Sequence, residues 1–165
     1  MKKENNLRNI ILISLISAVL VGCSSFGVPS TSDPAQKLSY AFQLMGMQRA
    51  IPAERLAKEA LDIYTMNGNV SGQSEAHFVL GVLYKSNQGH EKISGSNSYD
   101  KTIAHLSKAK SGYFSINEKI QASKATFEMA QAYRGKDDNI RYCALFHEAL
   151  ALYSSGEGKD KKVPI

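Results

Sequence analysis

The sequence contains little proline, and it lacks the alternation of apolar and polar residues that is typical of β-strands. It has 12 glycines and 4 prolines among 165 residues, while 43% of the residues are hydrophobic and 21% are charged. This is the composition of a globular domain, and it excludes a wholly disordered chain. Because no stretch shows sustained period-two alternation, we expect no β-sheet.

Motifs that carry enzyme chemistry are also missing. The sequence has no Gly-x-x-x-x-Gly-Lys, no Gly-x-Ser-x-Gly and no Cys-x-x-Cys. The pair His147-Glu148 lacks the second histidine that the zinc-protease motif His-Glu-x-x-His requires. The four histidines are scattered, and we interpret them as packing or exposed side chains. We therefore predict no enzyme activity, no metal site and no cofactor.

The first 22 residues have the organisation of an export signal. Lys2, Lys3 and Arg8 precede an unbroken apolar run at 10–21. A helix of that length rises about 18 Å, which is well short of the roughly 30 Å hydrocarbon core of a bilayer. The pattern predicts that 1–22 is a removable signal peptide rather than a membrane-spanning helix.

The apolar run ends in Leu20-Val21-Gly22-Cys23, which resembles the lipobox of bacterial lipoproteins. The resemblance implies that Cys23 becomes the acylated N-terminus, and two or three acyl chains anchor a protein firmly to a membrane. Ser24 follows the cysteine, at the position where an Asp resembles an inner-membrane retention signal. The resemblance therefore favours the outer membrane, facing the periplasm, over the inner membrane.

Residues 23–34 are rich in Ser, Pro and Gly, and they are predicted to form a flexible tether behind the lipid. Lipidation uses Cys23, so Cys143 has no intrachain partner and no disulfide is expected. The apolar neighbours of Cys143 predict that its side chain is buried in the core. Removal of the signal lowers the formal charge from +5 to about +3, which does not indicate a nucleic-acid partner.

The rest of the chain has helical periodicity. Ser32 or Asp33 is positioned to cap the first helix, and Asp137-Asp138 to cap the last. The polar insertion at 86–98 is long enough for a mobile or functional loop, and 155–165 is predicted to be a polar basic tail. Helices are predicted at 34–49, 52–66, 72–86, 98–114, 117–134 and 138–154. The candidate core residues are Leu38, Phe42, Leu56, Leu61, Leu80, Leu83, Phe127, Ala130 and Leu145.

Two patterns recur among these helices. The segments 58–64, 107–113 and 147–153 each place a Tyr four residues after an Ala. The other helices carry a large residue beside a very small one, in the pairs Met45-Gly46, Leu80-Gly81 and Met129-Ala130. Such recurrence is what stacked helical hairpins require, because small residues let neighbouring helices approach closely.

These patterns, above all the segment 76–84, resemble the tetratricopeptide repeat (TPR) family. The resemblance covers 35–154, with one unit of regular spacing and two irregular units. It implies an all-α fold of stacked helical hairpins, a TPR-like α-solenoid of about three irregular repeats. A helical bundle without repeats is the alternative.

Binding of a protein partner is the function that this architecture favours. The first helices of the hairpins line the concave surface of such a solenoid. In one hypothesis the protein is a lipid-anchored periplasmic adaptor or scaffold for an envelope assembly or secretion machine. In the other it is an immunity lipoprotein that neutralises a periplasm-acting toxin, such as a type VI secretion lipase, with 86–98 as a candidate plug. The predicted partner-binding residues are Tyr40, Gln43, Gln48, His77, Lys85, Glu128, Gln131 and Arg134.

Overall fold

The computed structural model describes residues 30–86 and 89–157. The predicted signal peptide, Cys23, most of the tether and residues 158–165 of the tail lie outside the described residues. The described helices belong to one compact unit, Thr31–Ile165. Its α-helices are α2 (Pro34–Gly46), α3 (Ala50–Met66), α4 (Val70–Lys85), α6 (Ser98–Ser115), α7 (Lys119–Gly135) and α8 (Asn139–Glu157).

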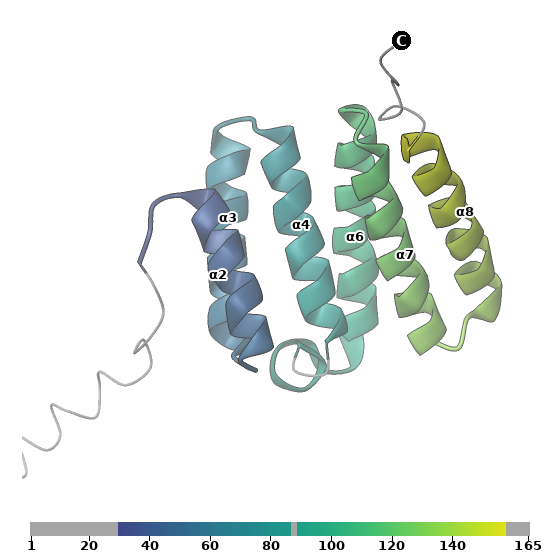
Figure 1. Cartoon of the computed structure of the whole chain (residues 1–165). Coiled ribbons are helices and arrows are strands. Elements are labelled where there is room, and N and C mark those ends of the chain that lie inside the picture. Colours follow the sequence, from purple (N-terminus) through teal and green to yellow (C-terminus); the bar gives the residue numbers. More distant parts are fainter. Residues whose placement is uncertain (1–29, 87–88, 158–165) are drawn as a thin grey trace, which may run out of the picture. The chain divides into compact units, whose positions relative to one another are not determined.

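These helices form three antiparallel hairpins that stack side by side (Figure 1). The hairpins pair α2 with α3, α4 with α6, and α7 with α8, and each new hairpin packs on the one before it through α3–α4 and α6–α7 contacts. The structure has no strand within the described residues. The prediction of an all-α stack of three helical hairpins is therefore confirmed, although α8 continues into the predicted tail as far as Glu157.

Helix ends follow the chemistry of their capping residues. The Asp33 carboxylate accepts a hydrogen bond from the amide of Ala35 (3.0 Å), and Pro34 takes the first position of α2. The Asp138 carboxylate accepts from the amide of Arg141 (3.0 Å) at the start of α8. Both bonds satisfy amides that have no partner within the helix. The predicted caps of the first and last helices are thus confirmed.

One turn geometry joins four pairs of consecutive helices. Each of these turns contains one residue in the left-handed region, namely Gln48, Gly68, Asn117 or Asp137, with φ between 59° and 62°. In each, the amide of the next residue donates to the carbonyl five positions earlier, as in a Schellman motif. These bonds are Arg49 to Leu44 (2.8 Å), Asn69 to Tyr64 (2.9 Å), Glu118 to Tyr113 (2.9 Å) and Asp138 to Tyr133 (3.0 Å).

The connection between α4 and α6 is different. It contains a π-helical turn, His90–Ser94, and a 3₁₀ turn, Gly95–Asn97. The buried hydroxyl of Ser98 donates to the carbonyl of Tyr84, which holds the start of α6 against the end of α4. The predicted loop at 86–98 therefore includes two short helical turns, and its role as a plug stays a prediction.

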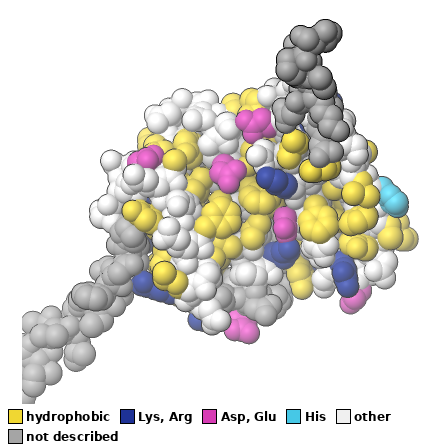
Figure 2. All heavy atoms as spheres, in the orientation of Figure 1, with side chains coloured by type: hydrophobic (Ala, Val, Ile, Leu, Met, Phe, Trp, Pro, Cys, Tyr) yellow, Lys and Arg dark blue, Asp and Glu magenta, His cyan; other side chains and the backbone are white. Residues whose placement is uncertain are grey.

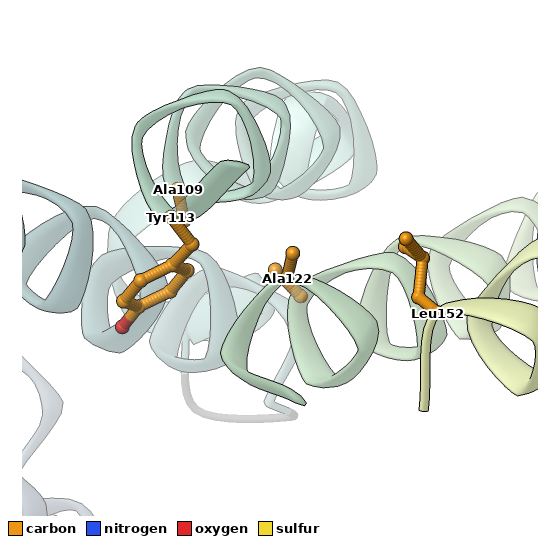
Figure 3. Packing of buried hydrophobic residues seen from close by; sticks show 5 residues of the cluster. Ala109, Tyr113, Ala122 and Leu152 are labelled. Atoms are coloured by element: carbon orange, nitrogen blue, oxygen red, sulfur yellow. The ribbon is translucent and has the colours of Figure 1, made fainter. Parts of the chain in front are cut away.

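Small side chains dominate the contacts between helices. Figure 3 shows Ala109 and Tyr113 of α6, Ala122 of α7 and Leu152 of α8 in one cluster, and Phe78 of α4 packs against it. Close packing of this kind gains many weak dispersion contacts. The alanines that are completely buried are Ala41, Ala53, Ala57, Ala60, Ala76, Ala109, Ala122, Ala125, Ala130 and Ala132.

The two helices of the second hairpin approach most closely at glycines. A Cβ atom on Gly81 would lie 2.6 Å from Cγ of Leu106, and one on Gly112 would lie 2.0 Å from Oγ of Ser74. Both distances are far below van der Waals contact, so a larger residue at either position would force the Leu106 or Ser74 side chain, or the helices, to shift. The pair Leu80-Gly81 in the sequence thus marks a true helix crossing.

Several predicted core residues are not buried. Leu38, Leu56, Leu80, Leu83 and Ala130 are buried as predicted, and Leu61 and Leu145 are half-buried. The prediction was wrong for Phe42 (40% exposed), for Phe127 (38% exposed) and for Cys143, which is exposed. Phe42 lies on the first hairpin, and Phe127 and Cys143 lie on the last. Each of these hairpins has a neighbouring hairpin on one side only, so part of its apolar surface stays uncovered.

Replacing Gly81 with Val should lower the free energy of unfolding by about 2 kcal/mol, because the added atoms overpack the contact with Leu106. Gly46→Val is the matched control, since a Cβ on Gly46 meets no atom within 4 Å. We expect the control to change stability by less than about 0.5 kcal/mol. Urea denaturation followed by circular dichroism measures both. Equal stability of the two variants would contradict the close crossing of α4 and α6.

Candidate functional site

An apolar groove, called here the end groove, lies open over α7 and α8, with Phe78 of α4 also in its lining. It has a volume of about 470 Å³. Figure 2 shows hydrophobic side chains gathered over α7 and α8. Leu150 and Tyr153 are 51% and 46% exposed, and the ring centroids of Phe127 and Phe146 are 6.1 Å apart. The apolar lining of the end groove consists of Phe78, Phe127, Phe146, Ala149, Leu150 and Tyr153.

The end groove exists because the stack stops there. In the first two hairpins the corresponding side is covered, since α4 packs on α3 and α7 packs on α6. No described helix packs on α8 from the far side. A terminal repeat usually carries a polar outer face for solubility. Here that side of the last hairpin is apolar, so it has the character of an interface.

Charged groups border the end groove on α7. The carboxylate of Glu128 forms an ion pair with Lys85 of α4, so this charge is already satisfied within the fold. Lys124 is exposed at the groove and makes no ion pair with any residue that the structure describes. The groove therefore combines aromatic walls with a positive edge.

A second group of polar side chains ties α3, α4 and α6 together. The hydroxyl of Tyr84 donates to Oε1 of Glu54 (2.7 Å), and Lys58 contacts the same oxygen (2.6 Å). Burial raises the pKa of the Glu54 carboxyl, but the bonds from Lys58 and Tyr84 outweigh this effect, so its pKa lies below the usual value. Lys101 lies over the Tyr84 ring, 5.4 Å from the centroid.

Two histidines extend this group. Nδ1 of His77 lies 3.0 Å from Nδ1 of His105, and the His105 ring centroid is 5.4 Å from that of Tyr84. Burial, together with the positive charge of the nearby Lys108, lowers the pKa of both imidazoles to about 4, and for His105 the neighbouring His77 also contributes. Both rings are thus neutral at pH 7, and one Nδ1 donates the proton that the other accepts. The group acts as a clamp between α4 and α6.

The described residues form neither a metal-ligand cluster nor a membrane-spanning helix. Within them, no cluster of three or more His, Cys, Asp or Glu side chains has a geometry that could hold a metal ion. None of the helices in residues 30–86 and 89–157 combines the length and apolarity needed to cross a bilayer.

The predicted partner-binding residues do not all meet on one surface. Tyr40 is half-buried and Gln43 exposed on α2, while Gln48 lies in the turn after that helix. His77 is directed to His105 on α6.

The other four predicted residues lie along α4 and α7. Lys85 and Glu128 join these two helices as an ion pair. Gln131 is half-buried, and Arg134 is exposed and lies over the ring of Tyr142 at 5.8 Å.

Sequence reasoning missed the end groove. Its signal was the composition of α8, where apolar residues occupy every side of the helix instead of a single stripe.

Comparison with known proteins adds no relative. No protein-family model, no curated protein and no solved structure matches this chain. The class that the fold itself defines is an all-α, solenoid-like stack of helical hairpins with an apolar groove at its last hairpin.

Acid should destabilise the protein through the histidine pair. The folded-state pKa of about 4 lies below the ordinary value of 6.5, so the unfolded chain binds protons first as the pH falls. Stability from the pair is complete above pH 6.5 and is lost as the pH falls towards 4. Since both rings are only partly buried, we expect a loss of about 2 kcal/mol for the pair.

The double variant His77→Asn/His105→Asn is the control, because it keeps every carboxylate that titrates in the same range. Thermal unfolding at pH 7 and pH 4.5 should show a fall in Tm for the wild type that exceeds that of the variant by about 5 °C. An identical fall in both proteins would contradict the neutral pair.

Proposed function

We propose that this protein is a lipid-anchored periplasmic adaptor that binds another protein of the bacterial envelope. The observation that carries the proposal is the end groove, where exposed Phe127, Leu150 and Tyr153 project from rigid helices. Contiguous apolar surface bordered by polar residues is typical of protein interaction sites, and aromatic anchors dominate their binding energy. The lipobox-like segment at 20–23 would hold this surface near the membrane.

The neighbouring first helices extend the candidate surface. The Lys85–Glu128 ion pair between α4 and α7 supplies polar groups beside the aromatic ones, since Glu128 also lines the groove. Interfaces combine an apolar centre with a polar rim of this kind. The surface therefore supports recognition of a folded or helical segment of a partner.

Capture of a partner tests the adaptor role. A soluble form that begins at Ser24, with an affinity tag in place of Cys23, is exposed to periplasmic extract and to secreted proteins. We expect a subunit of an envelope assembly or secretion machine, bound with a Kd near the micromolar range. A single secreted toxin held at nanomolar Kd or tighter would assign the immunity role instead. Recovery of no partner from either source would contradict both.

The anchor has its own test, since the two cysteines provide a matched pair. Cys23→Ser should abolish palmitate labelling and move the protein from the membrane fraction to the soluble fraction, because no acyl chain can attach. Cys143→Ser should leave labelling and membrane association unchanged. Labelling that survives in Cys23→Ser, or that depends on Cys143, would contradict the lipobox interpretation.

A further inference from the structure

We infer that the end groove binds one helix of a second protein, which runs antiparallel to α8. This helix places a small residue against Tyr153 and, about two turns later, a carboxylate near Arg134. It takes the position that the first helix of a fourth hairpin would occupy. The inference deepens the adaptor role proposed above and rests on it.

The last two hairpins present matching aromatic residues. Phe78 and Phe127 each lie three positions before the small member of a large–small pair, Gly81 or Ala130. On the second helices, Tyr113 and Tyr153 each follow a buried Ala by four positions. The same side chains therefore recur at the same places in both hairpins.

In the second hairpin the tyrosine is covered by the next helix, while Phe78 is half-buried and also lines the end groove. Tyr113 is 2% exposed and, together with Phe78, packs in one cluster with Ala122 and Ala125 of α7. The matching residues of the last hairpin are open, with Phe127 at 38% and Tyr153 at 46% exposure. A helix seated as α7 is seated on α6 would bury both.

The covering helix has a defined requirement opposite the tyrosine. A Cβ atom on Gly72 of α4 would lie 2.2 Å from Cδ1 of Tyr64, so only glycine fits under that ring. Tyr113 packs with Ala122 of α7 at the following junction. Both tyrosines thus meet a small residue near the start of the next helix, which predicts Gly or Ala opposite Tyr153.

The charges also recur. Lys85 lies four positions after Gly81 and pairs with Glu128 of the next first helix, α7. Arg134 lies four positions after Ala130, so it holds the place of Lys85 on the last hairpin. Among the described residues Arg134 has a cation–π contact with Tyr142 but no ion pair. The positive Arg134 is therefore complementary to a carboxylate on the bound helix.

Two segments of this chain do not supply the charge. The eight residues at 158–165 carry three lysines and one aspartate, so their net charge is positive, like that of Arg134. The α2 helix of a second copy, PAQKLSYAFQLMG, contains no acidic residue. Charge complementarity thus favours a helix from a separate partner that carries a carboxylate opposite Arg134.

A peptide with the sequence of residues 117–136 is the probe, because α7 fills the equivalent position on the second hairpin and contains both Ala122 and Glu128. Fluorescence anisotropy measures its binding to the soluble protein that begins at Ser24. Replacing Glu128 with Lys in the peptide should weaken binding to the wild-type protein about tenfold. The protein variant Arg134→Glu should weaken binding of the original peptide similarly and restore binding of the Lys peptide.

Leu150→Glu in the protein should abolish peptide binding, whereas Ile140→Glu should leave it within about twofold, since Ile140 is 86% exposed on α8 outside the groove lining. Circular dichroism checks that all variants fold. Failure of the peptide to bind the wild-type protein, or failure of the charge exchange, would overturn the inference. Sedimentation showing a wild-type oligomer that Leu150→Glu dissolves would make a second copy the occupant, which would also overturn it.

The same variants separate this inference from the proposed function. If a captured envelope partner binds wild type and Leu150→Glu equally, the adaptor role stands and the groove inference falls. If the charge exchange changes peptide binding as expected while no partner is captured, the groove is a helix-binding site and the adaptor role falls.

Discussion

The close crossing of α4 and α6 is the constraint on which the rest of the structure depends. Gly81 and Gly112 let the two helices approach so closely that the Leu106 and Ser74 side chains occupy the space that a Cβ atom would need. That approach positions Leu80 and Leu83 in the core and aligns His77 with His105. Because the second hairpin contacts both of the others, its geometry sets the surfaces on which the first and third hairpins pack.

Repetition of one turn carries this geometry along the chain. Each of four helix connections contains one residue in the left-handed conformation and is closed by the same type of backbone hydrogen bond. Consecutive helices therefore meet in similar orientations. A stack built in this way has no internal reason to stop, since each hairpin presents to the next the kind of surface on which it packs. The end groove is thus a direct result of the repeat, because Tyr153 and Arg134 have counterparts one hairpin earlier, Tyr113 and Lys85, that the next helix buries or pairs.

Periodicity in the sequence was sufficient to predict the helices, their pairing into hairpins and the caps at Asp33 and Asp138, because these depend on local chemistry. It was not sufficient to predict which apolar faces are covered. Phe127 has the same spacing as a core residue, yet only the arrangement of the hairpins shows that nothing described packs over it. The contact between His77 and His105 likewise joins residues 28 positions apart, and its partner could not be assigned without the fold.

The many buried alanines also influence how the protein responds to temperature. An alanine exposes less apolar surface on unfolding than a leucine does, and the heat-capacity change of unfolding scales with that surface. A stack held together by alanine contacts therefore has a flatter stability curve than a leucine-packed bundle of the same length. We expect its folding free energy to change more slowly on cooling and warming than that of such a bundle.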